Sequence, residues 1–141
     1  MNLDDPDHNK KLRDHTGYHP ETMMHVAKNL PEEQLKALAK GCYHLSECRR
    51  NGDDRNLVVV PLCRRERHRS VAARELIRAY LDQQNVSDVT VKDGPQINFP
   101  WHFCDNRRRN CDACKHYGAA NLQGWHNAVR VFTERMDKVH E

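Results

Sequence analysis

The sequence predicts a small α+β domain, mainly helical, that zinc holds together, with about four helices and one or two short β-hairpins. Six cysteines fall into two groups of three, and each group has histidines nearby. Apolar residues make up only 38% of the chain and charged residues 30%, so the hydrophobic core is expected to be thin. Small domains with a thin core commonly bind a metal or form disulfides.

The first 20 residues are polar and rich in aspartate and histidine, which predicts a flexible N-terminal arm. Its histidines are candidate ligands, although a lone surface histidine usually binds nothing. Residues 21–141 are expected to form a single compact zinc-binding domain. Its subregions, 21–84 and 85–141, would each contain one metal site.

Two helices are expected early in this domain. Residues 21–30 carry apolar side chains at helical spacing. A second helix is expected to begin at Pro31, with Glu32 and Glu33 in its first turn and Gly41 as its end. Residues 43–55 are expected to form a loop, because the stretch 51–54 (NGDD) is a turn signal.

The middle of the chain alternates between strand and helix signals. The β-branched run 57–62 predicts a short buried strand. Ser70 is expected to cap a helix that extends to about Gln84. Residues 86–91 and 97–99 are then expected to form short strands on either side of the turn 93–95.

The C-terminal segment has the clearest helical periodicity in the chain. Its apolar residues recur every three or four positions, which places them on one face of a helix: Leu122, Trp125, Val129, Phe132, Met136 and Val139. We expect this stripe to pack across the core of the domain. The alternative is a helix through which the protein forms a dimer.

The second cysteine group is the stronger metal signal. Cys111 and Cys114 have the two-residue spacing with which two thiolates bind one ion. Cys104 is the expected third ligand and His116 the fourth, with His102 and His126 as alternatives. The predicted site is a structural zinc with three thiolates and one imidazole.

The first cysteine group is spaced more loosely. Its predicted ligands are Cys42, Cys48, Cys63 and His68, with His44 beside them, so that the chain would hold two zinc ions. Disulfides and ordinary buried thiols are the alternatives for these cysteines. No apolar targeting segment follows Met1, which predicts an intracellular protein without a membrane span.

The stretch 56–68 (NLVVVPLCRRERH), with His44 upstream, resembles the core of an HNH (His-Me finger) nuclease. In that family, a β-hairpin and a helix hold one catalytic metal. The resemblance implies that His44 is the general base that activates water, Asn56 positions that water, and His68 binds the metal. Cys42 and Cys48 flank His44, whereas the family usually has paired cysteines before the base.

Arginine carries most of the positive charge near both cysteine groups, although the net charge is only +3. The planar guanidinium suits phosphate recognition, which predicts contact with nucleic acid. The alternatives are a solvated face or a surface that docks an acidic protein. The residues expected to contact nucleic acid are Arg64, Arg65, Arg67, Arg69, Arg107, Arg108 and Arg109.

These observations predict a zinc-stabilised, arginine-rich module that contacts nucleic acid or a nucleic-acid-handling complex. A metal-dependent HNH-like endonuclease is one alternative. A small viral or mobile-element accessory protein that binds a host protein, and inhibits or redirects it, is the other.

Overall fold

The computed structural model describes residues 15–61, 69–84, 86, 89–90, 114 and 122–139. These residues form four α-helices: α1 (Pro20–Asn29), α2 (Glu32–Arg50), α3 (Arg69–Gln83) and α4 (Leu122–Val139). The predicted α+β class with β-hairpins is wrong, because the described residues form helices and contain no strand. All four predicted helices are present.

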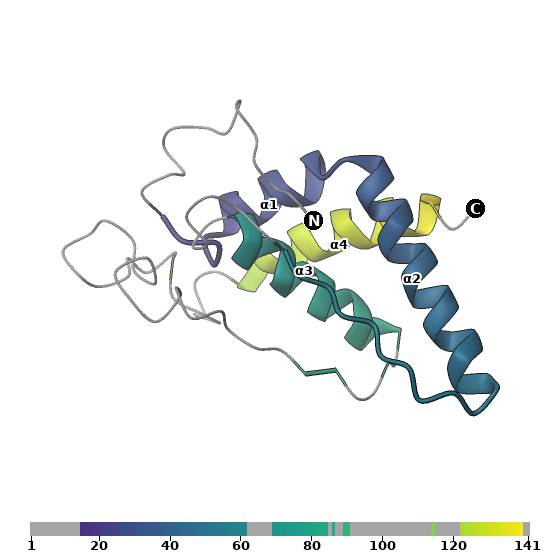
Figure 1. The fold of residues 1–141 in the computed structure, drawn as a ribbon. Coiled ribbons are helices and arrows are strands. Elements are labelled where there is room, and N and C mark those ends of the chain that lie inside the picture. Colours follow the sequence, from purple (N-terminus) through teal and green to yellow (C-terminus); the bar gives the residue numbers. More distant parts are fainter. Residues whose placement is uncertain are drawn as a thin grey trace.

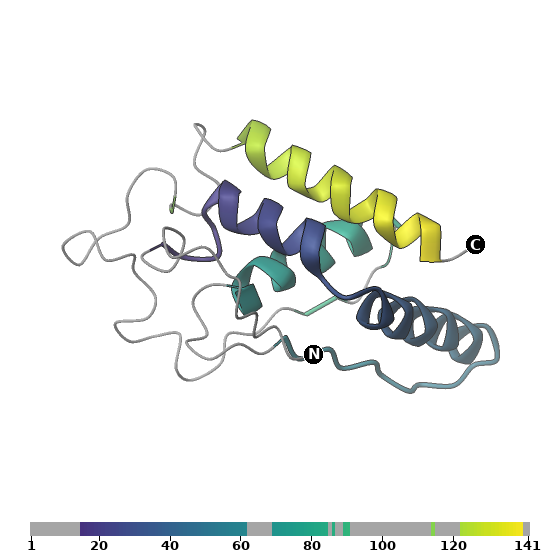
Figure 2. The ribbon, with the colours of Figure 1, turned by 90° about the horizontal axis from the view of Figure 1, so that it is seen from above.

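Helices α1, α3 and α4 lie side by side, and all three begin at the same end of the molecule (Figures 1 and 2). At that end, Trp125 Nε1 of α4 donates to the Tyr18 carbonyl, 2.8 Å away, just before α1. Arg74, near the start of α3, donates to the Tyr18 hydroxyl at 2.7 Å. Tyr18 therefore joins the beginnings of all three helices.

The core is built from one face of each helix. Phe132 of α4 packs edge-on against Tyr80 of α3, with 6.0 Å between the ring centroids. The largest fully buried apolar side chains come from all four helices: Met23, Leu35, Leu76, Phe132 and Met136. The predicted role of the α4 stripe in the core is confirmed at its buried members, whereas Leu122 at its beginning is exposed.

Helices α1 and α4 also make contact near their far ends. Arg135 of α4 donates to the carbonyl of Ala27 at 2.9 Å and to that of Leu30 at 2.6 Å. These carbonyls lie at the C-terminal end of α1, where the helix leaves backbone acceptors without intrahelical partners. The guanidinium therefore caps α1 from a neighbouring helix, and burial lowers the pKa of Arg135.

The prediction that Gly41 ends the second helix is wrong, because α2 continues for nine residues beyond it. Glycine inside a helix costs only about 1 kcal/mol relative to alanine, so favourable residues on both sides override it. The helix instead ends at Arg50, and Gly52 just beyond it has a φ of 76°, the left-handed conformation that favours glycine. Gly52 N–H donates to the Arg49 carbonyl and Asp53 N–H to the Cys48 carbonyl, which is a Schellman ending.

The two halves of α2 have different environments. Leu35, Leu38 and Ala39 are buried against the other helices. The second half extends beyond the core, and the chain then turns and runs back toward α3 (Figures 1 and 2). On this projecting half, Tyr43 is 66% exposed, whereas Cys48 is buried.

The strand predicted at 57–62 does not form over its described residues, 57–61. A strand requires a hydrogen-bonded partner as well as β-branched residues. Here Val58 is 78% exposed, whereas Val59 packs against the core. Val86 and Val89 are likewise outside any strand, and the predicted partner 97–99 lies outside the described residues.

Ser70 does not cap α3 as predicted, because the helix already includes Arg69 and Ser70 is buried within its first turn. Within the described residues, no helix is both long and apolar enough to cross a membrane.

Candidate metal centre

Cys114, the one described member of the second cysteine group, lies against the segment that precedes α1. Its side chain is fully buried. His15 Nδ1 lies 3.3 Å from Cys114 Sγ, although the two residues are 99 positions apart. The structure thus brings a thiol and an imidazole together from opposite ends of the chain.

The backbone of Thr16 completes this contact. Thr16 N–H donates to Cys114 Sγ at 3.3 Å, and the Thr16 hydroxyl donates to the Cys114 carbonyl at 3.4 Å. Tyr18 N–H in turn donates to the Thr16 hydroxyl oxygen at 3.3 Å. The sulfur therefore receives a hydrogen bond from a backbone that is itself held in a turn.

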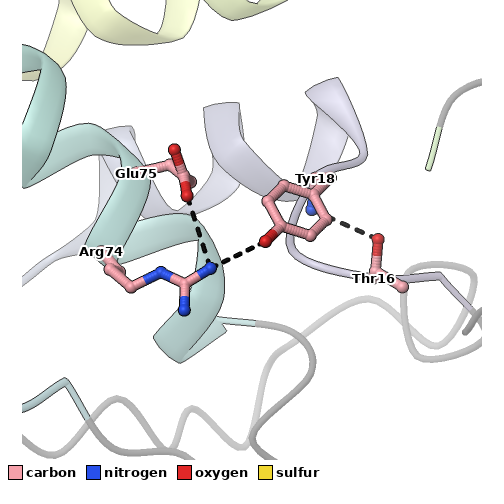
Figure 3. Close-up of polar contacts among 4 residues, drawn as sticks. All are labelled: Thr16, Tyr18, Arg74 and Glu75. Atoms are coloured by element: carbon pink, nitrogen blue, oxygen red, sulfur yellow. Dashed lines mark hydrogen bonds and ion pairs between the residues drawn. The ribbon is translucent and has the colours of Figure 1, made fainter. Parts of the chain in front are cut away.

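Figure 3 shows how this turn is anchored to α3. Arg74 Nη2 donates to the Tyr18 hydroxyl and lies 3.4 Å from Glu75 Oε1. Glu75 is buried, so its carboxylate needs this charged partner. The ring of Tyr18 also stacks near Trp125, with 6.4 Å between the centroids.

His19 lies close to His15, with 4.4 Å between the ring centroids. Its Nδ1 accepts from Glu21 N–H at 3.1 Å, so His19 is the N-cap of α1. Burial lowers the pKa of His19, and the charge of His15 lowers it further, against the opposing effect of Glu21. Both causes favour the neutral imidazole that the cap requires.

Residues 15–20 belong to the predicted N-terminal arm, yet they form this centre. Thr16 and Tyr18 are buried, and Pro20 begins α1. Residues 1–14 lie outside the described part of the chain. The sequence predicted the histidines of the arm only as possible ligands in general. It did not predict the contact of His15 with Cys114, because no sequence spacing links the two residues.

In the first cysteine group, α2 separates two of the predicted ligands. Cys42 and Cys48 are six residues apart in one continuous helix, which corresponds to an axial rise of about 9 Å and a rotation of about 120°. A single ion cannot bind both thiolates while this helix is intact. Burial also raises the pKa of Cys42, which disfavours its thiolate.

Cys48 has a closer partner in His44, one turn earlier on the same face of α2. His44 Nε2 lies 3.8 Å from Cys48 Sγ. Residues four apart in a helix are neighbours, so this pair is available to one ion. The described residues contain no group of three or more metal-binding side chains. The other predicted ligands lie outside the described residues: Cys63, His68, Cys104, Cys111 and His116.

The residues that the nuclease resemblance singles out are only partly described. His44 is an exposed residue in the middle of α2, and not on a strand as in the family. Asn56 accepts from Arg49 Nη2 at 3.3 Å, and His68 lies outside the described residues. The described residues therefore do not form the β-hairpin that the resemblance implies.

Of the residues predicted to contact nucleic acid, the structure describes only Arg69, at the start of α3. It also reveals three arginines that those predictions omitted, Arg49, Arg50 and Arg55, which lie around the end of α2 together with the acidic residues Glu47, Asp53 and Asp54. All three arginines are exposed, and we call them the α2 basic tip. The excess of arginine between positions 49 and 78 of the sequence could have pointed to these three residues.

A groove lies between α3 and α4 on the surface of the helical body. It encloses about 680 Å³, and its walls include Trp125 and Val129. Charged side chains of both signs line it, among them Asp82, Glu134 and Arg130. This mixture selects no ligand of one charge.

Comparison of the chain with protein-family models, with curated proteins and with solved structures finds no match. The assignment of function therefore depends on the geometry of the Cys114 centre and the α2 basic tip.

Proposed function

We propose that this protein is a zinc-stabilised, arginine-rich binding module that contacts nucleic acid or a nucleic-acid-handling complex. The observation that carries the proposal is the α2 basic tip. Arg49, Arg50 and Arg55 are exposed on a part of the chain that projects beyond the core (Figure 1). Guanidinium groups that project beyond the core can reach a phosphate backbone without obstruction from the helical body.

The contacts of these arginines support phosphate binding. Arg50 pairs with Glu47 at 3.0 Å and Arg55 with Asp53 at 3.1 Å, in both cases at the surface. Exposed ion pairs of this kind contribute little to stability. The guanidinium groups therefore exchange these partners for phosphate at small cost, and a bidentate contact with phosphate is favourable.

The exposed ring of Tyr43 lies on the same projecting half of α2. Exposed aromatic side chains can stack on unpaired bases. The arginine-rich run continues in sequence through Arg64, Arg65 and Arg67 to Arg69, and a second cluster lies between Cys104 and Cys111. Zinc would act by holding such segments in place rather than by catalysis.

One observation favours a protein partner as a second candidate. Val58 and Leu57 are exposed apolar residues on the segment that follows the α2 basic tip. Apolar side chains on such a surface are typical of protein interfaces. A partner bound there would depend on Val58, and its affinity would change little with salt.

Fluorescence anisotropy with labelled single-stranded and duplex oligonucleotides tests the proposal. The triple variant Arg49→Ala, Arg50→Ala, Arg55→Ala is expected to weaken binding and to reduce the slope of log affinity against log salt by about 0.7–0.9 per lost phosphate contact. Lys28→Ala is the matched control, because Lys28 is also exposed but lies on α1. Affinity that is insensitive to salt, or equal losses in both variants, would contradict the proposal.

A further inference from the structure

We infer that the groove between α3 and α4 is the docking surface for a second copy of this chain, with the two copies related by a two-fold axis. The inference goes beyond the proposed function, because it concerns α3 and α4 and not the α2 basic tip. It also locates the dimer contact that the sequence offered as an alternative for the C-terminal helix.

The groove combines apolar side chains with charged ones. Trp125 and Val129 of α4 and Ala79 of α3 line it, and of these Val129 and Ala79 remain partly exposed. At the beginning of α4, Leu122 also lines the groove and is 42% exposed. Exposed apolar side chains with polar residues around them are typical of surfaces that another protein covers.

The charged residues of the groove follow the same order on both walls. Arg78 and Asp82 are one helical turn apart on α3, and Arg130 and Glu134 are one turn apart on α4. All four side chains are exposed. Since both helices begin at the same end of the molecule, each wall has its arginine first and its acid second (Figures 1 and 2).

A hydrogen bond between the walls shows that the two acids are level with each other. The Thr133 hydroxyl donates to Gln83 Oε1 at 3.0 Å. Gln83 and Thr133 are the sequence neighbours of Asp82 and Glu134, so these acids lie at about the same height along the groove. The two arginines are one turn earlier on their helices. The groove therefore has a cationic band followed by an anionic band.

The four side chains of these bands form no ion pair within the described part of the chain. An arginine four residues before an acid is the less favourable order for pairing along a helix. Where the acid comes first, as with Glu32 and Lys36 of α2, the pair does form, at 3.4 Å. Glu75 also lines the groove, but it is buried and pairs with Arg74. Both bands are thus available to an external partner.

A second copy is the partner whose charges fit this pattern. A two-fold axis that crosses the groove between the bands reverses the direction of the helices in the second copy. The cationic band of each copy then faces the anionic band of the other, because a two-fold interface brings residue i against residue j and j against i. Arg130 of each copy would face Glu134 of the other. A ligand of one charge would instead face one band of its own sign, which is unfavourable.

Sedimentation velocity of the full chain over a range of concentrations tests the inference. The unmodified protein is expected to form a dimer. Arg130→Glu and Glu134→Arg are each expected to weaken this dimer by more than about tenfold, because each places like charges opposite one another at two symmetry-related positions. Lys36→Glu is the matched control, since it makes the same change of charge as Arg130→Glu on an exposed residue of α2. It is expected to leave the dimer unchanged.

Exchange of the two charges tests the pairing itself. An equal mixture of the Arg130→Glu and Glu134→Arg proteins is expected to form a heterodimer, and the double variant Arg130→Glu, Glu134→Arg is expected to recover the homodimer. Either recovery shows that the single variants are folded. A protein that is monomeric at all concentrations would overturn the inference. So would a dimer that neither substitution weakens, a dimer that Lys36→Glu weakens equally, or the failure of both recoveries.

Discussion

The two cysteine groups differ in how the chain brings their members together. Cys114 meets His15 and the Thr16 backbone across almost the whole chain, at the end where α1, α3 and α4 begin. Cys48 meets His44 one helical turn away, on the projecting half of α2. A metal at the first location would join segments that no helix connects, whereas a metal at the second would bind to a helix that already exists. The same residue types therefore have different consequences for stability.

The largest expected effect is the difference in thermal stability between a substitution at Cys114 and one at Cys48. Cys114→Ser is expected to lower the melting temperature by more than about 5 °C, because it puts a smaller and more polar group at a fully buried position and would remove one ligand of the proposed zinc. Cys48→Ser is expected to change the melting temperature by only a few degrees, since α2 retains its buried half. Circular dichroism during heating, with and without a chelator, measures both variants.

Similar melting temperatures for the two variants would remove the distinction between the groups. A chelator that lowers the stability of Cys114→Ser as strongly as that of the unmodified protein would also contradict it, because this variant would lack a ligand of the proposed metal.

A smaller effect is expected from two glycines that lie inside helices. A Cβ atom added to Gly124 of α4 would lie 2.7 Å from Pro20 Cβ, so the beginnings of α1 and α4 would have to move apart. Gly124→Ala is therefore expected to destabilise the protein by about 1–2 kcal/mol, after the gain in helix propensity is included. Gly41→Ala is expected to stabilise it by up to about 1 kcal/mol.

The reason for the opposite sign is the neighbour of Gly41. A Cβ atom there would lie 3.2 Å from Leu57 Cδ1, which belongs to an exposed side chain that can turn away. Urea unfolding measures both free energies. A lower free energy of unfolding for Gly41→Ala would mean that the Leu57 side chain cannot turn away from α2, although it is exposed.

The smallest effect concerns thiol reactivity. Cys42 is expected to react with iodoacetamide at pH 8 more slowly than a free cysteine, because burial raises the pKa of its thiol and lowers the thiolate fraction. Cys114 is expected to be protected more strongly, since it is fully buried and hydrogen-bonded. Mass spectrometry of a time course gives the rates. Faster labelling of Cys114 than of Cys42 would show that its centre opens readily.

Helical periodicity was sufficient to predict all four helices, and the first and last members of the predicted apolar stripe coincide with the ends of α4. The end of α2 was missed because glycine was taken as a stop signal at Gly41, whereas the left-handed conformation occurs at Gly52. The strand at 57–62 was predicted from β-branched residues alone, and such residues do not supply the partner that a strand requires.

The candidate site was also predicted only in part. The cysteine spacing pointed to Cys114 but not to His15, because no local rule connects positions 99 residues apart. The pairing of Cys42 with Cys48 was plausible only while residues 43–55 were expected to form a loop. Once α2 continues through them, helical geometry separates the two thiols.

The continuity of α2 through Gly41 also has a mechanical meaning. The ten residues from Gly41 to Arg50 continue the helix for about 15 Å beyond its buried half. A force applied at the α2 basic tip would be transmitted along the helix to the buried side chains Leu35 and Leu38, because no loop interrupts the helix between them.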